Sequence, residues 1–94
     1  MDYIQQGEYY LSIGHFQYAK KAFAYARRVN AQDWRCWFGL AAAITHNFTY
    51  YSSENWSKFV VTAKSLAVPE HCQYMDNRMG QFWINFCNMN NMYR

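Results

Sequence analysis

The 94-residue sequence has little of what marks membrane, secreted or disulfide-rich proteins. It contains no run near the roughly 18 apolar residues that a membrane helix needs, and its first residues lack the charged and apolar regions of a signal peptide. Its three cysteines, Cys36, Cys72 and Cys87, are odd in number and far apart, which argues against a disulfide framework. We therefore expect a cytoplasmic protein with reduced thiols and no membrane association.

Groups for metal binding and catalysis are also scarce. No two cysteines show the short Cys-x2–4-Cys spacing of zinc sites, and the neighbours His71 and Cys72 would point about 100° apart on a helix. The six acidic residues fall largely at expected helix starts, where a carboxylate suits the helix dipole. There is no glycine-rich phosphate loop and no Gly-x-Ser-x-Gly turn. The sequence therefore predicts neither an enzyme nor a bound metal or cofactor.

Apolar and aromatic residues, by contrast, are abundant, at 52% and 21% of the chain. Such a composition is far from that of a disordered chain, and it predicts a single domain over residues 1–94 with a bulky core. The net charge of +3 is mild, and the basic residues are spread along the chain. This balance does not by itself predict a nucleic acid as a partner.

Periodic small and large residues predict a first helical hairpin over residues 2–30. Asp2 is placed to cap a helix that runs to about Ile13, where Gly14 breaks it. A second helix is expected from Phe16 to about Val29. Its inner face recurs at three- and four-residue intervals, which is typical of an amphipathic helix: Ala19, Ala22, Phe23 and Ala26.

A second hairpin is predicted over residues 33–67. Asp33 is placed to cap a helix from Trp34 that is apolar almost all round, as expected for a central helix. Residues 48–53 have no helical period and are expected to form a loop. Ser52 or Ser53 should then cap the fourth helix, with Glu54 in its first turn.

One further helix is predicted over residues 69–90, beginning at Pro69. Gly80 lies inside its apolar stripe and costs about 1 kcal/mol relative to alanine, which indicates either a tight contact or a local bend. We expect this helix to cap the array, or else to leave an exposed aromatic edge for self-association. The side chains expected to be nearly inaccessible are Phe23, Trp37, Leu40, Phe59 and Trp83.

The first 44 residues resemble a tetratricopeptide repeat followed by the opening helix of a second. The positions that carry the resemblance are Tyr3, Gly7, Tyr10, Ala19, Phe23 and Ala26, then Trp37, Leu40, Ala41 and Ile44. The family has a 34-residue period, and Tyr3 shifted by 34 falls on Trp37. Ala31 stands where the family usually has proline, and the register is lost after Phe48. The resemblance implies an all-α, right-handed array of two antiparallel helical hairpins plus a C-terminal capping helix.

The resemblance also implies a function, that of a non-enzymatic scaffold or adaptor. Its partner, a protein or peptide segment, would bind in the concave groove lined by the first helix of each repeat. Carried onto this sequence, the partner-binding residues are Gln5, Glu8, Ser12, Arg35, Phe38, Thr45 and His46. The lysine and asparagine set by which some members hold a chaperone's C-terminal carboxylate is absent from these positions, so that specific function is not expected.

A function of another class stays open, because Lys20, Lys21, Arg27 and Arg28 pair at seven-residue spacing and form a basic strip across two helical turns. The protein would then be a small inhibitor or adaptor, in one version encoded by a phage, that meets a nucleic-acid-handling protein through this strip or through exposed aromatics. A solvated outer face explains the same strip, and the sequence shows no aromatic platform beside it. Neither the partner's identity nor the oligomeric state follows from the sequence.

Overall fold

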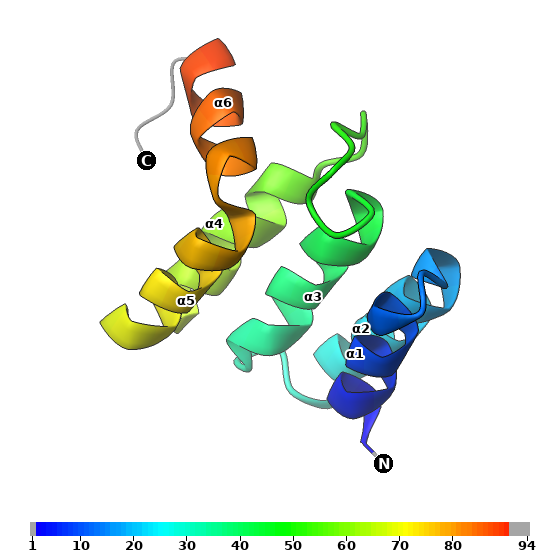
Figure 1. Cartoon of the computed structure of the whole chain (residues 1–94). Coiled ribbons are helices and arrows are strands. Elements are labelled where there is room, and N and C mark those ends of the chain that lie inside the picture. Colours follow the sequence, from blue (N-terminus) through cyan, green and yellow to red (C-terminus); the bar gives the residue numbers. More distant parts are fainter. Residues whose placement is uncertain (1, 91–94) are drawn as a thin grey trace.

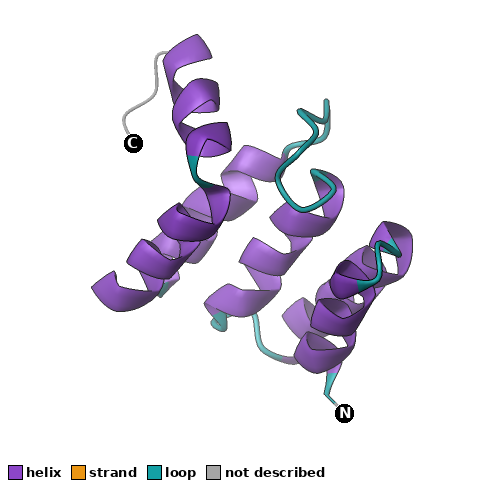
Figure 2. Cartoon of the chain, viewed as in Figure 1, coloured by secondary structure: helices purple, strands orange, loops and turns teal. Residues whose placement is uncertain are grey.

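The computed structural model describes residues 2–90, and this part of the chain is all-α, with no strand (Figure 2). Residues 1 and 91–94 of the expected domain lie outside the described range. The helices are α1 (Tyr3–Ser12), α2 (Phe16–Val29), α3 (Trp34–Ile44), α4 (Trp56–Leu66), α5 (Pro69–Met79) and α6 (Gln81–Met89). None of these helices is long and apolar enough to cross a bilayer.

The first five helices lie in two layers. Figure 1 shows α1, α3 and α5 side by side on one face, with α2 and α4 behind them. Each of α1 and α3 runs antiparallel to the helix that follows it, and α2 also packs against α3. The whole body measures 38 × 26 × 20 Å. The face formed by α1, α3 and α5 is therefore built from three segments far apart in the sequence.

Capping residues set the starts of the first and third helices, as predicted. Asp2 accepts a hydrogen bond from the Gln5 backbone N–H at 2.8 Å, and the Gln5 side chain accepts one from the Asp2 N–H at 3.1 Å. This reciprocal pair satisfies two backbone donors that a helix start leaves without partners. Asp33 caps α3 without such a reciprocal bond, because its carboxylate accepts from the Arg35 backbone N–H at 3.0 Å. The predicted bounds of α1 and α2 and the predicted start of α3 are confirmed to within one residue.

The side chain of Phe23 on α2 packs against two glycines on neighbouring helices. A Cβ atom on Gly7 of α1 would lie 2.5–2.7 Å from three atoms of the Phe23 ring, and one on Gly39 of α3 would come closer still. Both are nearer than real Cβ atoms approach. Glycine is required at these positions because any side chain would occupy the space of the ring. Phe23 is fully buried as a result.

Two members of the expected core lie at its margin instead. Phe23, Leu40 and Trp83 are buried as predicted, but the prediction is wrong for Trp37 and Phe59, which are only partly buried. The Trp37 indole N–H donates to the Ala31 carbonyl at 2.7 Å, so its polar end stays near the surface. Large side chains that fill the core in their place are Phe38, Trp56 and Met75.

The connection from α3 to α4 turns through three consecutive non-glycine residues with positive φ, His46, Asn47 and Phe48. Thr45 holds this turn, since its buried hydroxyl donates to the Ala41 carbonyl at 2.8 Å and accepts from the Phe48 N–H at 3.0 Å. Phe48 is itself buried. The hydrogen bonds and the burial together offset the steric cost of left-handed backbone, about 1–2 kcal/mol per residue.

The fourth helix begins later than predicted. It starts at Trp56, and neither Ser52 nor Ser53 caps it. The Ser52 hydroxyl accepts a hydrogen bond from the Glu54 N–H within a turn, and the Glu54 carboxylate lies 2.9 Å from Nζ of Lys20 on α2. Glu54, which was expected in the first turn of the fourth helix, therefore links the loop before α4 to α2 through its ion pair with Lys20.

The predicted helix over residues 69–90 is wrong as a single element, because Gly80 separates α5 from α6. Gly80 has φ +54° and ψ −134°, a conformation that L side chains rarely adopt, and a Cβ there would meet only one atom, at 4.0 Å. Glycine is therefore required at position 80 by the backbone conformation of the bend and not by close packing. Beyond it, α6 lies over the start of α4, with the Trp56 ring 5.9 Å from Trp83 and 4.6 Å from Phe86.

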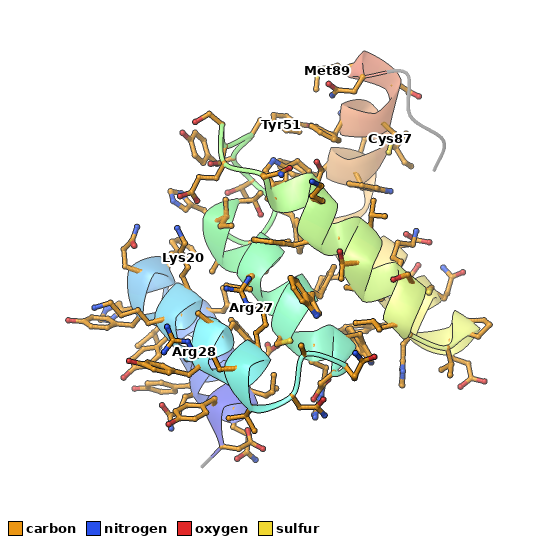
Figure 3. The ribbon with its side chains drawn as sticks, turned by 180° about the vertical axis from the view of Figure 1, so that it is seen from behind. Lys20, Arg27, Arg28, Tyr51, Cys87 and Met89 are labelled. Atoms are coloured by element: carbon orange, nitrogen blue, oxygen red, sulfur yellow. The ribbon has the colours of Figure 1, made fainter. Side chains whose placement is uncertain are left out.

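The loop before α4 also packs on α6. The Tyr51 and Phe82 rings stack at 4.1 Å with an angle of 8° between their planes, and the Tyr51 hydroxyl donates to the Phe82 carbonyl at 3.2 Å. Figure 3 shows Tyr51 extending toward α6. The residues inserted between the hairpin helices thus cover the helix that follows Gly80.

We predict that Gly39→Ala destabilises the protein, although alanine favours a helix by about 1 kcal/mol over glycine. The new methyl group would overlap the Phe23 ring, and overpacking of this kind costs about 3 kcal/mol at the upper end of its range. The expected net loss is about 2 kcal/mol, measured by urea denaturation. In a Phe23→Leu background the same substitution should be neutral or stabilising. An equal loss in both backgrounds would show that another neighbour requires Gly39.

Candidate binding groove

A groove of about 280 Å³ opens on the face formed by α1, α3 and α5. One lining residue comes from α1, three come from α3 and three from α5: Glu8; Trp34, Arg35 and Phe38; His71, Tyr74 and Arg78. The helix starts and the Phe23 packing fix the spacing of α1 and α3, and α5 supplies the opposite wall. The groove therefore exists only in the assembled fold.

Aromatic rings form the floor and one wall of the groove. Phe38 is the floor, with 2% of its surface exposed. The Trp34 ring lies 6.2 Å from Phe38, 6.0 Å from Tyr74 and 5.1 Å from His71. Tyr74 is 48% exposed, so much of its surface remains open to a ligand. The arrangement offers a rigid apolar surface bordered by polar groups.

Arg35, at one side of the groove, is held by Asp33. Its Nε lies 3.0 Å from one carboxylate oxygen of Asp33 and its Nη2 lies 2.7 Å from the other. These hydrogen bonds lower the pKa of the Asp33 carboxyl and raise that of the Arg35 guanidinium. The charge of Arg35 is therefore matched by a bidentate carboxylate from the same helix start.

Arg78 lies across the groove and has a different set of contacts. Its Nη2 donates to the Asn47 side-chain oxygen at 3.0 Å and its Nη1 donates to the Tyr74 hydroxyl at 3.2 Å. The guanidinium carbon lies 5.5 Å from the centre of the Phe38 ring. A carboxylate oxygen of Glu8 is 3.8 Å from Nη1, which is beyond hydrogen-bond distance. Arg78 thus joins α5 to α1 and to the turn after α3.

The structure brings three of the seven predicted partner-binding residues into this groove, namely Glu8, Arg35 and Phe38. Gln5 and Ser12 are exposed on α1 but do not line it. Their side chains bond locally, Gln5 to the Asp2 backbone and Ser12 to the Tyr9 carbonyl at 2.6 Å.

The placement predicted for Thr45 on the groove surface is wrong, because the turn after α3 needs its hydroxyl inside. His46 is exposed but stacks between Phe16 at 4.6 Å and Tyr50 at 5.1 Å, away from the groove lining. Phe38 is also no exposed contact, since it is buried as the floor.

Four lining residues were missed from the sequence: Trp34, His71, Tyr74 and Arg78. Of the three on α5, His71 and Arg78 lie outside the apolar stripe that predicts a capping helix over residues 69–90, and Tyr74 belongs to that stripe by sequence pattern. Their spacing of three and then four residues places them on one face of a helix, and this is the signal that could have identified them. Their polar and aromatic character distinguishes that face from the buried stripe.

The basic strip on α2 is divided by its surroundings. Lys20 pairs with Glu54, and Arg27 lies over the Trp37 ring at 5.2 Å, facing the second hairpin. Lys21 and Arg28 stay exposed on the outside of α2. Figure 3 shows Lys20, Arg27 and Arg28 along this side of the molecule. Lys20 and Arg27 therefore contact later segments of the chain, whereas Lys21 and Arg28 remain on the outside of α2.

An aromatic surface does lie beside the two outer cations, contrary to the expectation from the sequence. Tyr25 is 50% exposed, stacks on Tyr3 of α1 at 5.4 Å, and lies 5.6 Å below the guanidinium of Arg28. About two helical turns further along the hairpin, the ring centres of Tyr10 and Tyr18 lie 5.4 Å apart. These tyrosines line the seam between α1 and α2. The sequence did not show them as a group because they come from two helices.

The cysteines form no disulfide in the described range. Cys36 is buried, its thiol donates to the Asp33 carbonyl at 2.9 Å, and burial raises the pKa of this thiol. A thiol in such surroundings is a packing group and a poor nucleophile. Within residues 2–90 no three histidine, cysteine or acidic side chains gather where they could hold a metal ion.

Comparison with protein-family models, with curated proteins and with solved structures finds no match to this chain. No family is therefore assigned to it.

We predict that Asp33→Asn lowers stability only above the acid range. Asparagine caps a helix as well as aspartate does, so the substitution removes the ion pair with Arg35 and keeps the cap. The folded-state pKa of Asp33 is depressed below its usual 3.8, so the stabilisation is present above that value and is lost as the pH falls through the folded-state pKa. Because Arg35 is half exposed, the difference should stay below about 1 kcal/mol.

The measurement is urea denaturation of the wild type and of Asp33→Asn at a series of pH values from about 7 down to about 2. The two stability curves should converge at the acid end. A gap of constant size throughout would mean that the charge of Asp33 is not what stabilises α3.

Proposed function

We propose that the protein is a non-enzymatic protein-interaction module that binds a segment of a partner protein in the groove between α1, α3 and α5. The observation that carries the proposal is the meeting of Trp34, Tyr74 and Arg78, from two helices, over the buried Phe38 ring. Tryptophan, tyrosine and arginine are the residues that most often dominate protein–protein binding energy. The role that follows is that of a scaffold or adaptor.

We further propose a tetratricopeptide-like, right-handed array in which α5 and α6 close the second end. Three features support it: the 34-residue relation between Tyr3 and Trp37, the two hairpins, and the placement of α1, α3 and α5 on one face (Figure 1). In such arrays the first helix of each unit lines the binding surface, and the groove lies on the corresponding helices here. We also propose a cytoplasmic location, which the free thiols of Cys36, Cys72 and Cys87 within residues 2–90 support.

The tyrosine seam supports a second candidate function. Tyr3, Tyr25, Lys21 and Arg28 form an exposed aromatic and basic surface on the opposite part of the first hairpin. An inhibitor or adaptor of a nucleic-acid-handling protein would use such a surface against acidic groups. The groove remains the first candidate because three helices converge on it.

Selection of peptides on the intact protein tests the groove directly. The probe is a displayed library of random peptides about twelve residues long, which reach about 40 Å when extended and so span the 38 Å body. Peptides selected on the wild type should bind Tyr74→Ala at least about tenfold more weakly, as loss of an exposed aromatic contact implies. Tyr25→Ala is the matched control, since Tyr25 and Tyr74 are 50% and 48% exposed.

Two results would contradict the groove. Binders that lose affinity for Tyr25→Ala, or for Lys21→Glu with Arg28→Glu, but keep it for Tyr74→Ala would place the interaction on the tyrosine seam. If the library yields no binder to a wild-type protein that melts cooperatively, and is therefore folded, the result would argue against peptide recognition altogether.

A further inference from the structure

The charges that line the groove are compensated unequally. Arg35 donates two hydrogen bonds to the Asp33 carboxylate, at 2.7 and 3.0 Å, and this carboxylate balances its charge. Arg78 has only neutral hydrogen-bond acceptors, the Asn47 amide and the Tyr74 hydroxyl. Its one ion pair, with the half-exposed carboxylate of Glu8, is long, at 3.8 Å. Among the lining residues, Arg78 is therefore the cation with an incompletely matched charge.

Arg78 also has unused donors in a fixed orientation. A guanidinium carries five N–H groups in one plane, and the contacts to Asn47 and Tyr74 use two of them. These contacts, with the Phe38 ring 5.5 Å below, hold the plane of the guanidinium in place. A planar donor set that is already oriented loses little conformational entropy when it binds a carboxylate. The side chain is 20% exposed, which shields an ion pair from much of the solvent.

The neighbours of Arg78 define what else the ligand must carry. Trp34 and Tyr74 present ring surface beside it, and this surface suits an apolar or aromatic side chain. Resting on the proposed function, we propose that the groove recognises a partner segment in which a glutamate or aspartate side chain lies next to an apolar side chain. The carboxylate takes the place of Glu8 at Arg78, and the apolar group packs on Trp34 and Tyr74.

The geometry favours a carboxylate on a side chain within the segment over one at a chain terminus or a phosphate. A dianionic phosphate would call for more than one uncommitted cation, and Arg35 is already occupied by Asp33. The groove lies on a face where α1, α3 and α5 run side by side, so a segment can cross it and continue beyond (Figure 1). One guanidinium is enough for one side-chain carboxylate.

The test is a double-mutant cycle on peptides selected from the displayed library and synthesised with an amidated C-terminus. Each acidic residue of a peptide is replaced in turn by its amide, and binding to wild type and to Arg78→Gln is measured by fluorescence anisotropy. One acidic position should lose about tenfold or more in affinity on the wild type and little on Arg78→Gln, because a charged hydrogen bond contributes about 1.5–3 kcal/mol. Thermal melting of both proteins checks that the fold is retained.

Glu8→Gln provides an independent arm, since it removes the competing carboxylate without touching Arg78. It should strengthen binding of the acidic peptide a few-fold, on the order of two to five, and leave the amide version unchanged. The control is Glu54→Gln, which neutralises a carboxylate in the loop before α4 that pairs with Lys20 on α2 and should alter the affinity of neither peptide.

The outcomes separate this inference from the proposed function. Peptides that need Tyr74 but tolerate every acid-to-amide change would overturn the inference and leave the groove standing. Affinity that disappears on C-terminal amidation, or appears only with a phosphorylated residue, would also overturn it. A library without binders would overturn both. Coupling between one acidic position and Arg78, with a gain for Glu8→Gln, would establish the carboxylate site.

Discussion

The packing of Phe23 against Gly7 and Gly39 sets the separation of the first three helices. A protein interior has no spare volume, so a ring that fills the space of two missing side chains fixes how closely α1 and α3 approach α2. The relative placement of Glu8 on α1 and Trp34, Arg35 and Phe38 on α3 follows from that distance. The groove thus owes its width to a contact made in the layer behind it.

The hairpins were predictable because local signals determine them. Asp2 and Asp33 identify helix starts through their carboxylates, and the spacing of Ala19, Phe23 and Ala26 identifies the buried face of α2. Of the site, Glu8, Arg35 and Phe38 were found because the resemblance points to the first helix of each hairpin. His71, Tyr74 and Arg78 belong to α5, and the α3 residues that line the groove with them lie more than 30 residues earlier in the chain, so no local pattern relates the two sets.

Trp37 was predicted to be in the core and Phe38 on the binding surface, but Phe38 is buried and Trp37 only partly so. Sequence periodicity alone does not distinguish these two positions. The two are neighbours on a helix that is apolar almost all round, so the pattern cannot decide which of them faces the core. Tertiary contacts decide: the Ala31 carbonyl bonds the Trp37 indole at the surface, Arg27 covers its ring, and Phe38 turns inward under Arg78. A polar end on tryptophan and none on phenylalanine is the physical difference between them.

The stacking of Tyr51 on Phe82 ties the inserted loop to the helix beyond Gly80. The loop precedes α4 and α6 follows α5, so this contact joins the two segments that flank α4 and α5 in the sequence. Each of the two segments stabilises the other. Loss of order in α6 removes the Phe82 and Phe86 rings that pack on Trp56, and loss of order in the loop removes the Tyr51 ring from beside the same two phenylalanines. The loop and α6 therefore form one cooperative unit in local unfolding, distinct from the hairpin built on Phe23.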